Sequence, residues 1–440
     1  MAENTREIVL DMLLAIERGE DYSHKLMKAV LDKYDYLEAQ EKAFMKRLAE
    51  GTIEQQLKLD YVLDQFSSVP VKKMKPLIRC LMRMSVYQIL YMDSVPDSAV
   101  CNEAVKLASK RKFQNLKGFV NGVLRNIARN KEQIKWPDQA KEPDLWLSIR
   151  YSMPLWLVQL WQTQYGRERT LKMLEAIEKV HPVCIRFRTT LDKSARLGYI
   201  AQMEKLGVKV TPSPVLDYAY LLEKTEGIAA LPGYEEGAFT VQDVSSMLAV
   251  EEAGIRNTDF VMDICAAPGG KSLLAAEKAK KVLSRDVSEG KLALIEENAA
   301  RMQADNISVE QWDASVTDTQ YIEAADVVLM DVPCSGLGVM GKKRDIKYHV
   351  TPEGLKEITE LQRKIVAASW QYVKPGGVLL YSTCTVRREE NEEMCAWICR
   401  EFPFTMESCR QLFPGEDDCD GFFFARLRRA DEESKTKMRG

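Results

Sequence analysis

The stretch that decides the fold is Asp263-Ile264-Cys265-Ala266-Ala267-Pro268-Gly269-Gly270-Lys271-Ser272. It follows a short apolar run, Phe260-Val261-Met262, which has the length expected of a buried parallel strand. It precedes Leu273-Leu274-Ala275-Ala276-Glu277, which favours a helix. A strand, a Gly-rich turn and a helix predict the first βα unit of a doubly wound sheet, with backbone N–H groups at the turn facing an anionic or polar ligand.

Three interpretations of this turn are open. A Walker A loop ends as Gly270-Lys271-Ser272 does, but it begins with a glycine where this chain has Cys265, which argues against a nucleoside triphosphatase. The dinucleotide pattern G-x-G-x-x-G is absent as well. The turn is then either structural, with no ligand, or a loop for S-adenosylmethionine (AdoMet), and residues further along the chain favour AdoMet.

Composition limits the class of protein. The chain has 440 residues, of which 46% are hydrophobic and 29% charged, as in globular proteins of two to four domains. No apolar run approaches the roughly 20 residues of a membrane span, and the N-terminus lacks the pattern of a signal peptide. Ten cysteines in such a chain indicate a reducing compartment, so we expect a cytoplasmic protein.

Histidines and cysteines give no sign of a metal centre. The three histidines are His24, His181 and His349, and none has zinc-ligand spacing. Cys395 and Cys399 share a predicted amphipathic helix but have no second pair of ligands. We therefore expect no metal site and neither a Ser-His-Asp nor a Cys-His catalytic apparatus.

The N-terminal third predicts a helical bundle, which we place at residues 1–135. Apolar residues recur at helical spacing and no stretch alternates like a strand. Residues 71–135 hold four acids against fourteen basic residues, at positions 72, 73, 75, 79, 83, 106, 110, 111, 112, 117, 125, 129, 131 and 135. A solvated basic face would explain this excess, but a polyanion such as RNA explains it more simply, and Lys110, Arg111 and Lys112 are the first candidates for contacts.

The middle of the chain, residues 145–230, predicts a small α/β module. The run 183–188 alternates like a strand and puts Arg186 and Arg188 on one face, where we expect them to meet RNA. A helix at 193–206, a Gly207 cap and a strand at 208–211 follow.

Residues 235–430 predict a catalytic domain with a βαβ rhythm. Five strand-like runs occur at 260–264, 281–284, 307–311, 326–330 and 378–382. The second leads to Asp286, where a carboxylate binds ribose hydroxyls in such folds, and the third leads to Asp313, placed to reach an adenine amino group. Any one of these acids could cap a helix instead, but acids at successive strand ends make that interpretation weaker.

Two cysteines follow the next two strands. The fourth strand runs into Asp331-Val332-Pro333-Cys334, and the fifth runs into Thr383-Cys384. Either cysteine alone could be a small buried hydrophobe. Together, over the crevice of the Gly-rich turn, they fit methylation of a pyrimidine C5, in which a thiolate adds to C6 and makes C5 nucleophilic. Asp331 would assist, either protonated or as a hydrogen-bond partner of the cytosine N3/N4 edge.

The motifs DICAAPGGKS, DVPCSGLGV and YSTCTVRREENEE resemble the Nop/Sun family of RNA cytosine-C5 methyltransferases. The segment Phe119-Val120-Asn121-Gly122-Val123-Leu124-Arg125 resembles the end of a NusB-type RNA-binding bundle, which points to bacterial 16S rRNA enzymes within that family. The chain departs from the family pattern at Arg344-Asp345-Ile346-Lys347-Tyr348, where the family usually has His-Pro-Asp-Ile-Lys-Trp and where the resemblance places part of the RNA-binding groove.

The resemblance implies a role for each matching residue. Cys384 would be the nucleophile, Cys334 would assist product release and Asp331 would act beside them. The residues implied for AdoMet are Cys265, Ala266, Ala267, Pro268, Gly269, Gly270, Lys271, Asp286, Asp313 and Asp331. The expected fold is an all-α NusB-like bundle, a small α/β module and a Rossmann-like methyltransferase domain, in a monomer that binds 16S rRNA and neither metal nor membrane.

Two other functions remain open at this stage. A DNA cytosine-C5 methyltransferase would attack with the cysteine of its Pro-Cys loop, here Cys334, but the Thr-Cys motif and the basic bundle argue against it. A non-catalytic RNA-binding factor would have degraded AdoMet residues, and none are degraded here.

Overall fold

The structure is a computed structural model that describes residues 4–19, 23–179, 181–225 and 227–431. The chain forms two compact units. The first, the helical unit, consists of Met1–Glu178 and Lys342–His349, and the second consists of Lys179–Gly341 and Val350–Gly440. The segment Lys342–His349 thus belongs to a different unit from the residues on either side of it. The expected domain limits at 135, 145, 230 and 235 stay predictions.

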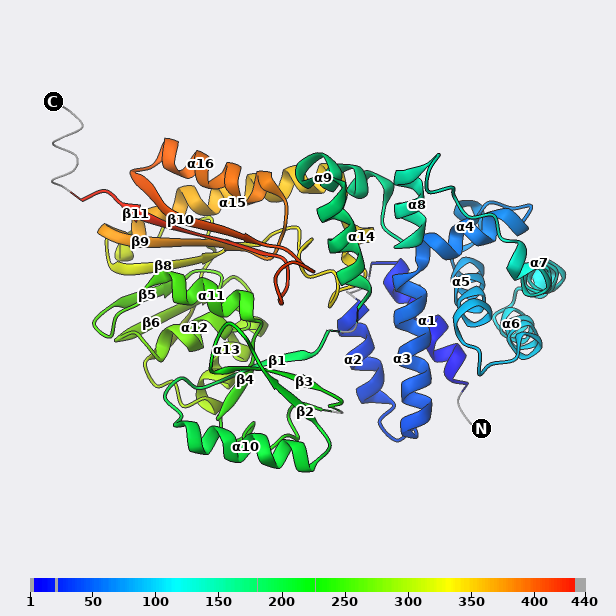
Figure 1. The fold of residues 1–440 in the computed structure, drawn as a ribbon, viewed down its shortest axis with the longest axis horizontal. Helices are drawn as coiled ribbons and strands as arrows, with labels where there is room; N and C mark the ends of the chain where they lie inside the picture. Colours follow the sequence, from blue (N-terminus) through cyan, green and yellow to red (C-terminus); the bar gives the residue numbers. More distant parts are fainter. Residues whose placement is uncertain (1–3, 20–22, 180, 226, 432–440) are drawn as a thin grey trace. The chain divides into compact units, whose positions relative to one another are not determined.

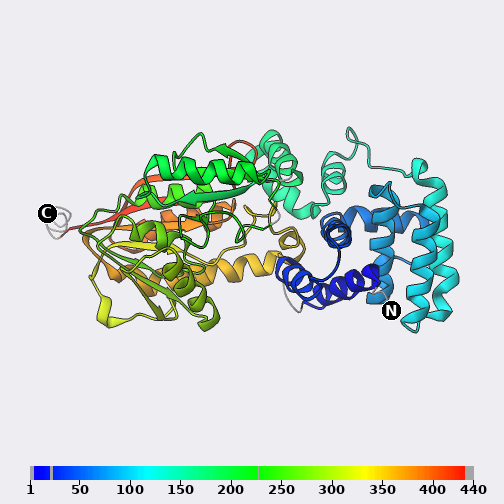
Figure 2. The same ribbon diagram turned by 90° about the horizontal axis from the view of Figure 1, so that it is seen from below.

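The described part of the helical unit contains helices and no strand (Figure 1). Its helices are α1 (Thr5–Glu17), α2 (Ser23–Lys33), α3 (Ala39–Glu54), α4 (Gln56–Phe66), α5 (Pro76–Tyr91), α6 (Asp97–Lys110), α7 (Lys117–Asn130), α8 (Pro143–Arg150), α9 (Leu155–Glu178) and α14 (Ile346–His349). Helix α5 is central and packs against α1, α3, α4, α6 and α7, and its Leu81, Met82 and Val86 are fully buried. The blue and cyan helices of Figure 2 show this bundle, so the predicted helical fold is confirmed.

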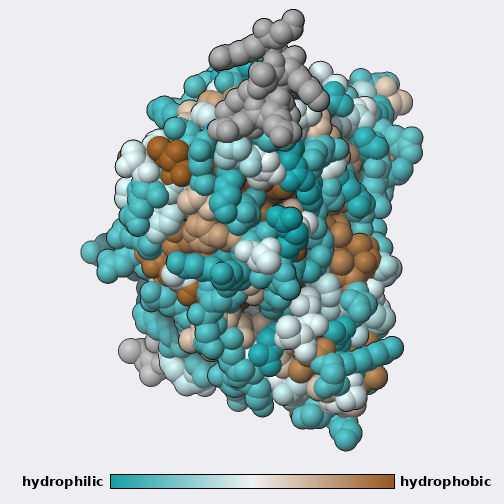
Figure 3. Space-filling model, turned by 90° about the vertical axis from the view of Figure 1, so that its left-hand side faces the viewer, coloured by the Kyte–Doolittle hydropathy of each residue, from teal (hydrophilic) through white to brown (hydrophobic). Residues whose placement is uncertain are grey.

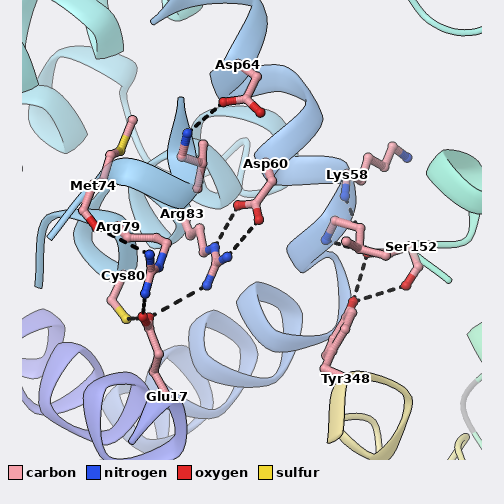
Figure 4. Close-up of polar contacts among 12 residues, drawn as sticks. Glu17, Lys58, Asp60, Asp64, Met74, Arg79, Cys80, Arg83, Ser152 and Tyr348 are labelled. Atoms are coloured by element: carbon pink, nitrogen blue, oxygen red, sulfur yellow. Dashed lines mark hydrogen bonds and ion pairs between the residues drawn. The ribbon is translucent and has the colours of Figure 1, made fainter. Parts of the chain in front are cut away.

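Several basic residues of the helical unit are not available to a partner. Arg83 forms two hydrogen bonds of 2.7 Å to Asp60, and Arg79 pairs with Glu17 inside the bundle (Figure 4). Lys110 pairs with Glu7 at 2.6 Å. The positive charge counted from the sequence therefore overstates the charge that the surface offers.

The second unit begins with a small antiparallel sheet of strand order β2-β3-β1-β4. Its elements are β1 (Val183–Phe187), α10 (Lys193–Lys205), β2 (Lys209–Pro212), β3 (Ala219–Glu223) and β4 (Phe239–Val241). The predicted strand, helix and strand are present, and β3, which the sequence did not predict, pairs with both β1 and β2. Ile185, Phe187, Met203 and Leu222 form its core.

The prediction that Arg186 faces RNA is wrong. Its side chain is 0% exposed, forms an ion pair with Glu277 and donates to the Gln242 side chain at 2.7 Å. Strand β1 lies between β3 and β4, and the face that carries Arg186 packs inward. Arg188 is half-buried, with a long hydrogen bond of 3.3 Å to Gln303.

The large sheet has seven strands in the order β10-β11-β9-β8-β5-β6-β7. They are β5 (Phe260–Asp263), β6 (Lys281–Asp286), β7 (Ile307–Gln311), β8 (Ala325–Asp331), β9 (Val373–Thr383), β10 (Phe404–Leu412) and β11 (Phe422–Arg429). The five predicted runs correspond to β5, β6, β7, β8 and β9, which are the parallel strands of this sheet. The sequence predicted neither β11, which is antiparallel to β9, nor β10, which is antiparallel to β11. Strand order reverses between β5 and β8, which is where doubly wound sheets bind ligands.

Helices cover both faces of this sheet, as Figure 1 shows. One face carries α15 (Pro352–Ser369) and α16 (Glu392–Glu401), whose Ile365, Val366 and Ile398 pack on the strands. The other carries α11 (Val244–Ala253), α12 (Gly270–Ala276) and α13 (Glu289–Arg301). The surface in Figure 3 is mostly hydrophilic, with separated apolar areas, as expected of a water-exposed surface. Among the described residues, none of the helices combines the length and hydropathy needed to cross a bilayer.

Candidate active site

The Gly-rich turn joins β5 to α12 at the carboxyl end of the sheet. Gly269 adopts φ +100°, a conformation that favours glycine. The Ala266 N–H donates to the Arg285 carbonyl on β6 at 2.8 Å, and the Asn298 side chain on α13 donates to the Pro268 carbonyl at 3.2 Å. The turn is therefore fixed by its neighbours on both sides.

Asp286 lies beside this turn, as predicted from its position after β6. Its carboxylate is 6% exposed and accepts the Ala267 N–H at 3.4 Å and the Ser288 N–H at 3.2 Å. Both hydrogen bonds are long and use about half of the four lone-pair sites of a carboxylate, so acceptor capacity remains for a ligand hydroxyl.

Asp313 is placed differently. It lies just after β7, is exposed, and accepts hydrogen bonds from the Ser315 N–H at 2.9 Å and the Ser315 hydroxyl at 2.7 Å. These hydrogen bonds lower the pKa of Asp313. Residues 312–318 form no helix, so these hydrogen bonds belong to a turn and not to the helix cap that the sequence left open. The proposed contact with adenine stays a prediction.

A buried carboxyl group lies under the turn. Asp263, at the end of β5, is 1% exposed and accepts the Ser272 hydroxyl at 2.7 Å, while its second oxygen has no partner in the structure. Burial raises the pKa of Asp263 to about 6. Asp263 was not among the site residues predicted from the sequence.

Lys271 connects the turn to the neighbouring strand. Its ammonium group lies 2.6 Å from a carboxylate oxygen of Asp331 at the end of β8, and 5.2 Å from the centre of the Phe422 ring. The second Asp331 oxygen accepts the Ser382 hydroxyl of β9 at 2.8 Å. Burial alone would lower the pKa of Lys271, but the charge of Asp331 outweighs it and raises that pKa. The structure thus brings residues of three adjacent strands together.

The two cysteines meet at the ends of β8 and β9. The Sγ atoms of Cys334 and Cys384 lie 3.1 Å apart, and both cysteines are free thiols. The Gly338 N–H donates to the Cys384 carbonyl at 3.0 Å, which holds one cysteine loop against the other. The hydrogen bond with Cys384, together with burial, raises the pKa of Cys334 well above its ordinary value.

Two further residues support the cysteine loops. Glu390, 0% exposed, accepts the Ser335 N–H at 2.9 Å, and burial raises its pKa. Gln362 on α15 donates to the Pro333 carbonyl at 2.9 Å and to Glu390 at 3.0 Å. Neither residue was predicted from the sequence as part of the site, although Glu390 lies in the motif YSTCTVRREENEE, because only their burial under the loops shows what they do.

A doubly wound sheet with an AdoMet-type turn after its first strand and paired residues at its fourth and fifth strand ends defines an AdoMet-dependent methyltransferase. Residues 253–428 match the family described as "16S rRNA methyltransferase RsmB/F". Residues 3–129 match the NusB family, and residues 153–229 match the ferredoxin-like domain of RsmF/B-like methyltransferases. The chain belongs to the ribosomal RNA small subunit methyltransferase B (RsmB) family, whose cofactor is AdoMet.

Individual relatives cover nearly the whole chain. A Bacillus subtilis protein, "Probable ribosomal RNA small subunit methyltransferase B", is 34% identical over 97% of this chain and 99% of its own length. A Salmonella arizonae "Ribosomal RNA small subunit methyltransferase B" is 32% identical over 94% and 95%. Among solved structures, the crystal structure of PH0851 shares the fold, with a TM-score of 0.81, 23% identity and coverage of 98% of this chain and 100% of that one. The chain is therefore an rRNA small-subunit methyltransferase in fold and class.

Proposed function

We propose that this protein methylates C5 of a cytosine in 16S rRNA through a covalent bond between Cys384 and C6 of the base. The resemblance carried by its motifs points to cytosine 967 in standard 16S numbering. The observation that carries the proposal is the 3.1 Å separation of two thiols beside the Lys271–Asp331 pair. A methyltransferase that acts on a nitrogen or an oxygen has no need of two adjacent cysteines.

The chemistry follows from the low reactivity of C5. When the Cys384 thiolate forms a bond to C6, the 5,6 double bond is lost and its electrons make C5 a nucleophile. AdoMet, when bound, supplies an electrophilic methyl group. Loss of the C5 proton and expulsion of the Cys384 thiolate then restore the aromatic ring, which completes the reaction without net change to the enzyme.

The resemblance assigns the attack to Cys384 and the later steps to Cys334. Cys334 follows β8 and Cys384 follows β9, the neighbouring strand, and their Sγ atoms lie 3.1 Å apart, so both thiols can reach the same base.

Asp331 is suited to select the base. Its carboxylate is held by Lys271 and Ser382, so it acts as an acceptor. A carboxylate accepts the exocyclic amino group of cytosine, whereas uracil offers an oxygen at that position. This contact favours cytosine over uracil.

The residues of the turn fit AdoMet. The proposed binding residues are Cys265, Ala266, Ala267, Pro268, Gly269, Gly270, Lys271, Asp286, Asp313 and Asp331. The fixed Gly269 turn offers backbone groups, and the spare acceptor capacity of Asp286 suits a ribose diol. Asp313 is exposed after β7, the next strand of the sheet.

The helical unit offers a surface for the RNA backbone. A groove of about 500 Å³ runs between α6 and α7 and is lined by Asn102, Val105, Lys106, Lys117, Gly118, Asn121 and Arg125. Lys106, Lys117 and Arg125 are exposed, and among the described residues none lies within 4 Å of where a Cβ on Gly118 would be. Cationic and amide groups beside an uncovered glycine let a phosphate backbone approach closely.

Trapping the adduct tests the proposal. Cys384→Ala should transfer no methyl group to a 16S rRNA transcript and form no covalent adduct. Cys334→Ala should still attack the base and accumulate as a protein–RNA species that survives SDS. Cys409→Ala, a change at an exposed cysteine of β10, is the matched control and should behave as wild type.

The pattern of adducts decides between mechanisms. A stable adduct from Cys384→Ala with none from Cys334→Ala would move the nucleophile to the Pro-Cys loop, as in DNA cytosine methyltransferases. Mass spectrometry of the trapped peptide identifies the sulfur that carries the base. Bisulfite mapping of 16S rRNA from cells with and without the gene identifies the nucleotide.

A further inference from the structure

An exposed tryptophan lies in the helical unit, where the chain passes from α7 to α8. Trp136 is 44% exposed, although an indole ring gains much from burial. It follows the exposed Lys135 and precedes Pro137, which is buried, and all three residues belong to the helical unit. Exposure alone assigns no role, because single apolar residues are common on protein surfaces, so the way in which the ring is held decides what it can do.

Helix α4 supports one side of the Trp136 ring. Tyr61 stacks on it, with ring centres 6.1 Å apart and ring planes inclined by 17°. The Lys58 ammonium group lies 5.4 Å from the centre of the Trp136 ring. Lys58 and Tyr61 lie three residues apart on α4, so they are neighbours on one side of that helix. The ring therefore rests on α4, and its exposed part is turned away from this helix.

Hydrogen bonds of the neighbouring residue hold Trp136 in this position. The Tyr61 hydroxyl donates to the Lys135 carbonyl at 3.0 Å, and the Lys135 N–H donates to the Gln65 side chain at 3.0 Å. Pro137 restricts the backbone on the other side. The ring is thus presented in one orientation, and little conformational entropy is lost when a partner covers it.

The charges near the ring favour a neutral planar group over a phosphate directly on the rings. Burial and the nearby charge of Glu142 raise the pKa of Tyr61, so a carboxylate lies beside the stacked pair and would repel an anion there. Lys135 is exposed and forms no ion pair with any described residue, so its ammonium group is available to an anion next to the ring. A partner that combines a neutral ring with a flanking negative charge fits both features.

An unpaired nucleotide of RNA is such a partner. A base that is splayed out of a single strand offers its π-face to an aromatic side chain, and its phosphate offers a negative charge. A base within a duplex is already stacked on both sides and has no free face. The chain belongs to a family of rRNA methyltransferases, so RNA is the partner whose bases this ring meets.

We propose that Trp136 is a stacking platform for an unpaired base of the substrate RNA, with Tyr61 and Lys58 behind the ring and Lys135 beside it for a phosphate. The proposal deepens the proposed function, on which it rests for the identity of the RNA. It adds contact with a base to the contacts with the phosphate backbone in the groove between α6 and α7. The platform makes the helical unit prefer single-stranded RNA to duplex RNA.

Replacement of the ring tests the proposal in the full-length protein. Trp136→Leu keeps an apolar side chain on α4 but removes the aromatic face, whereas Trp136→Phe keeps a smaller aromatic face. The matched control is Tyr36→Leu, because Tyr36 is an aromatic residue of the same unit and is 70% exposed. Filter binding of a 16S rRNA transcript at several salt concentrations measures the Kd and its salt dependence.

Trp136→Leu should raise the Kd about 5- to 150-fold, the loss expected of one stacked base. The slope of log K against log salt should not change, because no cation is removed. Trp136→Phe should lose less, and Tyr36→Leu should bind as the wild type does.

Three results would overturn the proposal. The first is a wild-type Kd in Trp136→Leu. The second is an equal loss in the Leu and Phe variants, which would mean lost packing instead of lost stacking. The third is the same loss with a fully paired RNA duplex, whose bases have no free face.

Crosslinking of the wild type does not depend on the stability of a variant. Ultraviolet irradiation of its complex with the transcript, followed by mass spectrometry of RNA-linked peptides, should find a base linked to Trp136. RNA links confined to other residues would overturn the proposal. A wild type that binds RNA through Trp136 but forms no 5-methylcytosine would count against the proposed function alone.

Discussion

Replacement of Asp286 by alanine is the most direct test of the cofactor site. The Asp286 carboxylate accepts two long backbone hydrogen bonds and has about two lone-pair sites left for ribose hydroxyls. A hydrogen bond to a charged group contributes about 1.5–3 kcal/mol, so Asp286→Ala should raise the Kd for AdoMet roughly 10- to 150-fold. Asp286→Asn keeps one acceptor and should lie at the lower end of that range.

Lys291 provides the matched control for charge. Its ammonium group lies 3.5 Å from the buried Asp286 carboxylate, but the Lys291 side chain is 56% exposed, so solvent screens its charge and we expect a contribution of about 0–1 kcal/mol. Lys291→Met should therefore change the Kd by less than about fivefold.

Calorimetry with AdoMet and with S-adenosylhomocysteine measures the effect. The two ligands share the ribose, so Asp286→Ala should weaken both equally. A wild-type Kd for both ligands would refute the reasoning. A loss for AdoMet alone would place Asp286 near the methyl group instead of the ribose.

Two further predictions concern the helical unit. Lys117→Gln and Arg125→Gln together should weaken RNA binding and reduce the slope of log K against log salt by about 0.7–0.9 per lost phosphate contact. Lys106→Gln and Lys110→Gln, whose partners are Glu103 and Glu7, should each change the slope less, and an unchanged slope in the double variant would contradict the groove. Burial would raise the pKa of Asp345, but hydrogen bonds from His349 and Ser23 outweigh it and lower that pKa to about 2. Because this pKa is below its unfolded value of about 3.9, the stabilisation that ionised Asp345 gives above pH 4 should be lost as pH falls towards 2. Asp345→Asn should therefore flatten the dependence of the free energy of unfolding on pH in this range, as measured by urea unfolding. An identical pH dependence in the variant would contradict the assignment.

The parallel strands were predictable because each is an apolar run with a recognisable motif at its end. Asp331, Cys334 and Cys384 could be placed near one another for the same reason, since the carboxyl ends of parallel strands meet at one edge of a sheet. Strand β10 was not predictable, because its polar residues lie at the edge of the sheet and offer little alternation. Local patterns reveal an element when one face of it is buried, and β10 is mostly exposed.

The errors have a common physical origin. Alternation showed that Arg186 lies in a strand, but burial of that face depends on Glu277, which lies 91 residues further along the chain. Lys347 looks like part of an exposed loop, yet its partner carbonyl on Glu54 is 293 residues away. A charged residue whose partner is distant in sequence cannot be distinguished from a solvated one without the fold.

The helical unit is discontinuous in sequence, and this affects how it is made. A ribosome completes Glu178 long before it reaches His349, and domains tend to fold as units during synthesis. Until then the carbonyls of Glu54 and Tyr151 lack the Lys347 ammonium group. The helices can assemble early, but the native bundle is finished only after most of the sheet-containing unit has been synthesised. A fragment that ends at Glu178 is therefore an incomplete fold, although it contains nearly all of the helices.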